Sequence, residues 1–345
     1  GGLHGNVPPR ERALFAPEVR SLLASCHVAV GNLEFTVPGD GSCVPTEPRV
    51  VATPDWVDAV AAAGLHVVGL ANNHVFDCLE AGFQNLRARL ERAGLRYFGA
   101  GMDLDEAVAP ARMEVGGLRL AFLGAADRRS GPYRFAAPGQ FGVAPLDLPR
   151  LTGQIAVLNR EVDHVIVAVH WGEERFLIPS PEQIAQARAM IDAGAAMVLG
   201  HHPHVLQGME LWRGRPIHYS LGNFVADDVP YADGDVLQWN RTERTGAVLL
   251  AELGPKGVGG LRQIPTCDNR RLVDVDRSGF GERRLDRAGR ALARGVTLRR
   301  YRREHLWVKT LLPILAHLRW SELKRIRPRH FRNALRSLRD GIGAR

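Results

Sequence analysis

The sequence predicts a layered α/β fold, and two observations predict it. Short apolar runs alternate along the first two thirds of the chain with stretches whose apolar residues recur at helical spacing. Several of the apolar runs end in Asn, His or Glu, as strands do when their carboxyl ends form a ligand-binding edge. A chain of 345 residues with 45% hydrophobic content can build one large core. We therefore expect an α/β domain over residues 1–281 and an extension over residues 282–345.

The predicted helices have recognisable starts and ends. Thr53 can cap the second helix, Pro54 suits its first turn and Gly64 ends it, while Gly94 ends the third. In chain order, we expect helices over residues 13–25, 53–63, 80–93, 148–161 and 181–193.

The predicted strands are the apolar runs between these helices. Gly116 and Gly117 separate two such runs and give the strongest hairpin signal in the chain. Residues 1–9 are loop-like, and residues 35–52 form a long loop rich in Pro, Gly and Thr. In chain order, we expect strands at residues 27–30, 65–70, 95–98, 113–115, 118–123, 163–169, 195–199, 210–212, 216–219, 246–253 and 261–265.

Four of the strand ends carry side chains that bind metals. A lone His-x-His, such as His202 and His204, is more often a solvated turn, but here the pattern recurs at three other strand ends. In layered α/β folds these loops converge beyond the carboxyl ends of the strands. Several His with Asn and Glu then predict a dinuclear metal site. The four strand ends carry Asn32 and Glu34, Asn73 and His74, His170, and His202 and His204.

The net charge of +8 conceals an asymmetry between body and tail. Residues 282–345 contain 19 Lys or Arg and five Asp or Glu, so the tail carries +14 and residues 1–281 carry −6. The tail can bind nucleic acid, an anionic membrane surface or a polyanionic substrate, or it can be a solvated face of Arg-rich helices. Several of its apolar residues fit a helix that packs on the body or on a membrane surface, with a kink at Pro313. They are Leu306, Leu311, Leu312, Ile314, Leu315 and Leu318.

Other sequence features restrict the class of protein. No stretch approaches the roughly 20 apolar residues of a membrane-spanning helix, and no signal peptide is recognisable. The location is therefore undecided between the cytoplasm and the periphery of a membrane. The chain starts with Gly, and we expect it to be a fragment. Its four cysteines include no Cys-x-x-Cys pair, which argues against a zinc ribbon or a redox motif. Buried free thiols are expected, and a disulfide stays open.

The polar motifs resemble those of the capsule-synthesis CapA family in order and spacing. That family is associated with poly-γ-glutamate production and belongs to the calcineurin-like metallophosphoesterase superfamily. The resemblance covers about residues 25–265 and implies a four-layer αββα sandwich. The motifs are Asn32-Leu33-Glu34, Asn72-Asn73-His74 with Asp77, His170-Trp171-Gly172 with Glu174, His202-Pro203-His204 with Gln207, and Tyr219-Ser220-Leu221-Gly222-Asn223-Phe224.

Two positions depart from the family pattern. The superfamily's first strand and its Gly-Asp motif, which supplies an aspartate ligand, have no counterpart before Gly1. We expect that this strand is missing from the chain, because Asp40 lies in a loop and substitutes for it poorly. Arg49 stands where the family pattern leads us to expect a lysine.

The resemblance also implies roles for individual residues. His74 would donate a proton to the leaving oxygen, and Asp77 would orient its ring. Two divalent ions of manganese, iron, zinc or cobalt are implied. Their ligands would be Glu34, Asn73, His170, His202 and His204. The residues expected to surround the ligands or to bind substrate are Asn32, Glu174, His201 and Asn223.

Two hypotheses for the function follow, and a third is kept. The first is a hydrolase or transferase that uses a metal-activated water on a phosphoester or on an amide-linked, poly-γ-glutamate-like polymer. The second is a non-catalytic, metal-binding accessory of capsule polymer assembly or export. The third, a nucleic-acid phosphodiesterase assisted by the basic tail, predicts binding that weakens steeply with salt.

Overall fold

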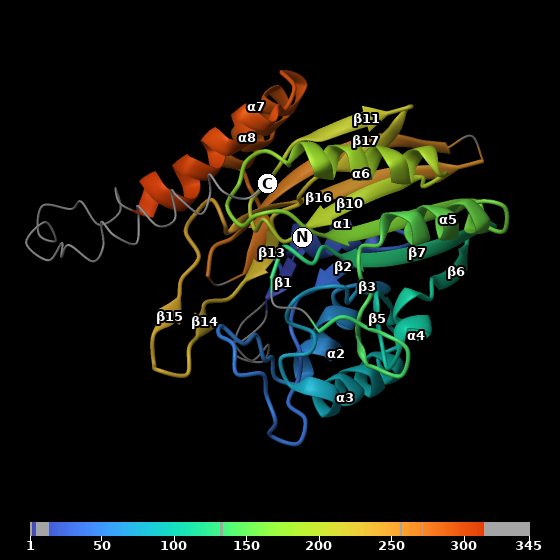
Figure 1. Ribbon diagram of the computed structural model, residues 1–345, viewed down its shortest axis with the longest axis vertical. Coiled ribbons are helices and arrows are strands. Elements are labelled where there is room, and N and C mark those ends of the chain that lie inside the picture. Colours follow the sequence, from blue (N-terminus) through green and yellow to red (C-terminus); the bar gives the residue numbers. More distant parts are fainter. Residues whose placement is uncertain (1, 5–13, 132–133, 256, 271, 314–345) are drawn as a thin grey trace, which may run out of the picture.

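The chain folds around two β-sheets. The computed structural model describes residues 2–4, 14–131, 134–255, 257–270 and 272–313 (Figure 1). One sheet is parallel throughout, with the strand order β13-β1-β2-β3-β4. Its strands are β1 (Gly2–His4), β2 (Val30–Leu33), β3 (Val67–Gly69), β4 (Arg96–Phe98) and β13 (Asn223–Ala226).

The second sheet is mixed, with the order β11-β12-β10-β9-β7-β6. Its four central strands run parallel, and the hairpins β6–β7 and β11–β12 add an antiparallel strand at each edge. The first hairpin was predicted, as were both strands of the second, and the positive φ angles of Gly116 and Gly117 account for the tight turn of the first. The strands are β6 (Ala111–Val115), β7 (Leu118–Ala126), β9 (His164–His170), β10 (Met197–His201), β11 (Met209–Trp212) and β12 (Arg215–His218).

All five predicted helices are present among the described residues. The predicted cap of α2 is wrong: Thr53 Oγ1 has no hydrogen-bond partner among the described residues, and its backbone carbonyl instead accepts from the Trp56 N–H. Helix α6 carries a full capping box between Ser180 and Gln183. The helices are α1 (Pro17–Ala24), α2 (Asp55–Ala62), α3 (Leu79–Arg92), α5 (Leu148–Leu158) and α6 (Pro181–Asp192), and a short α4 (Leu104–Val108) was not predicted.

Each sheet is apolar on both faces because helices cover one face and the other sheet covers the second. In β3, Val68 joins the cluster beneath α2 and α3, whereas Val67 joins the cluster between the sheets. In β9, Val167 packs under α5 and α6, and Ile166 faces the space between the sheets. Figure 1 shows the helices on these two sides. Burial of each such side chain contributes roughly 1.5–3 kcal/mol, so the layers hold the carboxyl ends of the strands in place.

Two segments of the N-terminal part differ from the prediction. Residues 2–4 were expected in a loop but form β1, which lies between β2 and β13. This short Gly-rich segment has no strand pattern of its own, so pairing on both sides decides its conformation. Strand β2 shares only Val30 with the run predicted at residues 27–30, because pairing with β3 begins at Val30 opposite Val67.

The C-terminal third adds a long hairpin and basic helices. The late strands were predicted but are longer, and β17 also pairs with β18. The elements are β16 (Thr245–Gly254), β17 (Gly257–Asp268), β18 (Val273–Val275), α7 (Phe280–Ala293), α8 (Leu298–His305) and the π-helix η2 (Leu306–Leu311); small pairs are β5 (Ala100–Gly101) with β8 (Gly142–Val143) and β14 (Val229–Pro230) with β15 (Val236–Leu237).

The described part of the tail is partly exposed. Leu306, Leu311 and Leu312 are exposed, whereas Val308 in η2 is buried. Ile314, Leu315 and Leu318 lie outside the described residues. Among the described helices, none has the length and apolar character needed to cross a membrane.

Candidate metal centre

Five side chains from four loops meet at the carboxyl ends of the two sheets. Glu34 follows β2, Asn73 follows β3, His170 ends β9, and His202 and His204 follow β10. The parallel register places His170 of β9 opposite His201 of β10, so the loops leave the sheet at the same level. The structure thus brings together all five residues that the sequence suggested as ligands.

Glu34, His202 and His204 form the most compact group. One ligand atom from each lies within 4.8 Å of the others, and all three side chains are buried. Glu34 Oε1 is 3.7 Å from His204 Nε2 and 3.6 Å from His170 Nε2. An ion with ligands at about 2.0–2.2 Å separates opposite ligand atoms by up to about 4.4 Å, so a shift of a few tenths of an ångström closes this group around a cation.

Asn73 and His170 extend the group. Asn73 Oδ1 lies 3.0 Å from His170 Nε2, which lies 3.2 Å from His202 Nδ1. Imidazole nitrogens, an amide oxygen and a carboxylate in one buried cluster are a donor set that manganese, iron, zinc and cobalt accept. The residues therefore fit a divalent metal centre.

The electrostatics of the cluster keep the imidazoles of His202 and His170 neutral. Burial, followed by the neighbouring imidazole of His204, lowers the pKa of His202 to about 4. Burial lowers the pKa of His170 well below its usual value, against the opposing charge of Glu34. Because a neutral ring is the form that binds a metal, these rings require no deprotonation at pH 7.

His74 and Asp77 form a hydrogen-bonded pair beside this cluster. His74 Nδ1 donates to Asp77 Oδ2 at 2.8 Å, and His74 Nε2 lies 2.9 Å from Asn73 Nδ2. The Val50 N–H also donates to Asp77 Oδ2, at 2.7 Å. Burial by itself would lower the pKa of His74, but the hydrogen bond and the charge of Asp77 outweigh it and raise that pKa. The ring is therefore oriented and more basic than burial alone would leave it.

Other polar residues orient the cluster. Asn32 Nδ2 donates to Glu34 Oε2 at 2.8 Å, and Asn223 Oδ1 lies 3.0 Å from His204 Nδ1. Burial would raise the pKa of Glu174, but electrostatic interaction with the nearby His204 and His202 outweighs burial and lowers it. Asn32 and Asn223 therefore act on the cluster through hydrogen bonds, and Glu174 acts on it through its charge.

The fourth predicted residue, His201, interacts with the cluster electrostatically, since the charge of Glu34 partly offsets the effect of burial on its pKa. It is buried, and desolvation lowers its pKa to about 3. Its Nδ1 has no hydrogen-bond partner within the described residues. His201 is the last residue of β10, before the turn that carries His202 and His204, and it is not part of the compact group.

The backbone at the histidine turn is strained. His202 has φ 95° and His204 has φ 56°, in the left-handed region that side chains with a Cβ disfavour. A Cβ at Gly200 would lie 1.9 Å from the carbonyl oxygen of Tyr219, so only glycine fits there. Strain held in place by the surrounding structure is typical of functional sites.

The sequence analysis assigned no role to two residues that contact the site. Trp239 places its ring 5.0 Å from the ring of His204, and its segment carries no motif that could have revealed this. Asn72 is buried, donates to the carbonyl of Leu33 at 2.7 Å, and accepts from the N–H groups of His74 and Val75. Its place directly before Asn73 was the available signal.

Trp171 and three further histidines lie apart from the cluster. Trp171 is fully buried in the core and donates to the carbonyl of Tyr219. His66 accepts from the Ala29 N–H, and His164 lies against the carbonyl of Gly254. His218 is buried in the second sheet. All four serve the fold.

The tail helices pack on the loop that follows His170. Lys309 Nζ lies 3.1 Å from Glu173, and Glu304 accepts from the Leu177 N–H at 3.0 Å. Tyr301 packs on Phe176 with ring centroids 5.3 Å apart. The tail helices therefore support the loop that follows His170, next to the cluster.

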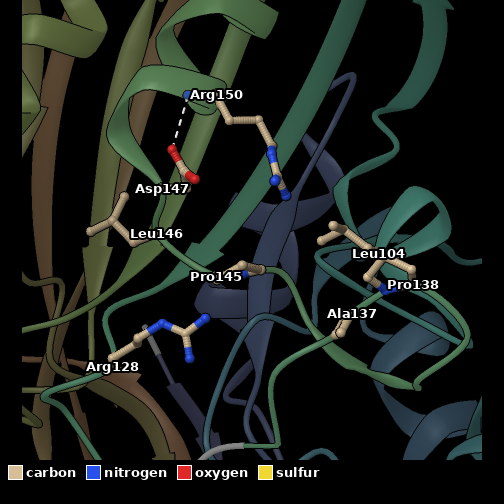
Figure 2. Close-up of a pocket in the computed structure, with 9 residues that line it drawn as sticks. Leu104, Arg128, Ala137, Pro138, Pro145, Leu146, Asp147 and Arg150 are labelled. Atoms are coloured by element: carbon tan, nitrogen blue, oxygen red, sulfur yellow. Dashed lines mark hydrogen bonds between the residues drawn. The ribbon is translucent and has the colours of Figure 1, made fainter.

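A pocket of about 290 Å³ lies at the end of the neighbouring strand β7 (Figure 2). The guanidinium groups of Arg128 and Arg150 reach its rim from two sides, and Asp147 caps α5 by accepting from the Arg150 N–H. Arg128 directly follows Asp127, whose N–H donates to the carbonyl of His170 at 2.9 Å. The pocket therefore lies along the same sheet edge as the histidines.

Comparisons with known proteins match bacterial capsule synthesis proteins. The family model "Bacterial capsule synthesis protein PGA_cap" matches residues 9–228. PGA biosynthesis protein CapA of Bacillus subtilis (strain 168) is 36% identical over 245 residues, covering 70% of this chain and 61% of the relative. Capsule biosynthesis protein CapA of Bacillus anthracis is 35% identical over 217 residues, covering 62% and 50%. A Mycobacterium tuberculosis protein named "Probable polyglutamine synthesis accessory protein" is 36% identical over 211 residues, covering 58% and 56%.

The chain thus spans between half and about three fifths of the length of these relatives. Among solved structures, a hypothetical protein from Thermus thermophilus matches 76% of this chain and 96% of its own, with 15% identity and a TM-score of 0.45. A putative 5′-nucleotidase from Staphylococcus aureus matches 62% of this chain and 40% of its own, with 15% identity and a TM-score of 0.40.

Proposed function

This chain belongs to the bacterial capsule synthesis family PGA_cap, and from that premise we propose that it is a metal-dependent hydrolase or transferase. Its substrate is an amide-linked, poly-γ-glutamate-like polymer or precursor, or a phosphoester. The names of its relatives, which refer to capsule and polyglutamine synthesis, support the polymer. One observation carries the proposal: Glu34, His202 and His204 converge in a buried group beside the His74–Asp77 pair.

We assign the proposed roles to this chain's own residues. Glu34, Asn73, His170, His202 and His204 would hold two divalent ions. When bound, such ions activate a water molecule and stabilise developing negative charge. Asn32 and Asn223 orient the ligands, and His74, aligned by Asp77, gives a proton to the leaving group.

We also propose an architecture for the domain and a role for the tail. Two packed sheets with helices on their outer faces support a four-layer αββα sandwich of the metallophosphoesterase type. The basic helices after residue 281 would form an extension that docks through Ala288 and Leu292. The exposed Leu306, Trp307 and Leu312 support contact with a membrane surface.

A turnover assay tests the proposal. The full-length protein is incubated with an aryl phosphate or with poly-γ-glutamate, with added manganese or zinc and with a chelator. Release of the aryl alcohol or shortening of the polymer with metal, lost on chelation, supports the enzyme. For the His74→Ala variant of the Discussion, His27→Ala is the matched control in this assay, because His27 is exposed and lies before β2, away from the cluster. Metal binding without turnover of either substrate would favour the non-catalytic accessory function.

The arginine pocket predicts how a polymer is held. Carboxylates pair well with guanidinium groups, so a polyanionic chain crossing the metal centre can continue to Arg128 and Arg150. Replacing both with alanine should raise the KM for poly-γ-glutamate about tenfold, a loss of about 1.4 kcal/mol, and leave the KM for an aryl phosphate unchanged. Arg160→Ala is the control, because Arg160 is exposed and does not line the pocket. Equal effects on both substrates would contradict a polymer-binding role.

A further inference from the structure

We propose that Cys43 and Cys78 form a reversible disulfide next to the His74–Asp77 pair, and that these two cysteines are a redox modification site. Their sulfur atoms lie 3.5 Å apart, although 35 positions separate them in the sequence. Both are free thiols in the structure. A disulfide requires about 2.05 Å, so the sulfurs have to approach by about 1.5 Å. The inference does not depend on the proposed function.

The two thiols differ in ways that assign their roles. Cys43 is partly exposed, so a small oxidant can reach its sulfur from solvent. Cys78 is buried, and burial, followed by its hydrogen bond with Cys43, raises the pKa of Cys78 to about 12. Cys43 is therefore the attacking thiol, and Cys78 reacts second.

The oxidant is a small disulfide such as glutathione disulfide. The Cys43 thiolate attacks one sulfur of glutathione disulfide and forms a mixed disulfide, releasing one glutathione thiolate. The Cys78 thiol loses its proton to solvent and attacks the Cys43 sulfur, which releases the second glutathione. Two protein thiols are oxidised, one glutathione disulfide is reduced to two thiols, and no other reactant is needed.

The bond would fix a loop against the His74–Asp77 pair. Asp77 directly precedes Cys78, and its carbonyl accepts from the Val44 N–H at 2.9 Å. Its carboxylate accepts from the Val50 N–H at 2.7 Å and from His74 at 2.8 Å. The segment from Cys43 to Val50 is thus already bonded to Asp77 at two places. A disulfide closing this loop constrains the unfolded chain and stabilises the fold.

Mass spectrometry of the full-length protein tests the inference. After incubation with glutathione disulfide, we expect a loss of about 2 Da and a peptide cross-link between Cys43 and Cys78. The melting temperature should rise by about 5 °C or more, and dithiothreitol should reverse both changes. Cys43→Ser and Cys78→Ser should each abolish the cross-link. Cys26→Ser and Cys267→Ser are matched controls that should retain it.

One further measurement keeps the test decisive. If a cysteine variant fails to fold, alkylation of the wild-type protein decides, because Cys43 should react before Cys78. The inference is overturned if all four thiols survive oxidation, if the cross-link involves Cys26 or Cys267, or if Cys43 keeps glutathione without a cross-link.

Discussion

Glu34→Gln is expected to lower the metal content to less than about a tenth of the wild-type value and turnover by about 10³-fold or more. Glu34 contributes the carboxylate of the buried group with His202 and His204, and its Oε1 lies within 3.7 Å of two imidazole nitrogens. Glutamine keeps the size of the side chain but removes its negative charge. Divalent ions surrounded by neutral imidazoles and an amide then lose the charge that compensates their burial.

Elemental analysis of purified protein, together with a manganese titration, measures this effect. Glu182→Gln is a matched control, because Glu182 lies on α6 with an exposed side chain. Circular dichroism shows whether the Glu34 variant is folded. A folded variant with wild-type metal content would contradict the assignment of Glu34 as a ligand. A second replacement, His204→Ala, should give the same loss, since His204 belongs to the same group.

The ends of the strands explain why much of the site could be predicted. Glu34, His170 and His204 each follow an apolar run, and parallel strands place such ends along one edge. Their distances could not be predicted, because these depend on how the two sheets pack. The positive φ angles of His202 and His204 were also hidden, since the surrounding structure imposes them rather than local preference.

Other features lacked a local signal altogether. Trp239 reaches His204 from a segment without helical or strand periodicity, so its approach depends on tertiary packing. The strand Gly2–His4 exists through pairing with two neighbours. Thr53 looked like a helix cap by residue type, but the backbone carbonyl closes that turn. Cys43 reaches Cys78 because the long loop over residues 35–52 folds back, and nothing in the composition of that loop predicts its path.

His74→Ala is expected to lower kcat by about 10²–10⁴-fold while metal content stays near the wild-type value. Among the described residues, His74 bonds to Asp77 and to the amide of Asn73, and it stands beside the compact group rather than in it. Loss of a positioned proton donor has an effect of this size. The KM should change little, because the missing interaction acts in the transition state. A parallel loss of metal would instead indicate that His74 holds the centre together.

The pH profile gives this prediction a second readout. Asp77 raises the pKa of His74 in spite of burial, so the protonated ring persists to higher pH. As a proton donor, His74 is active below its pKa, and kcat should fall as the pH rises through that value. Asp77→Asn removes the negative charge and should move this descending limb to lower pH. If the limb stays in place in Asp77→Asn, or moves to higher pH, another group supplies the proton. Because Asp77 also accepts from the Val50 N–H, an amide oxygen at this position can still hold the loop, which separates the change in charge from a change in fold.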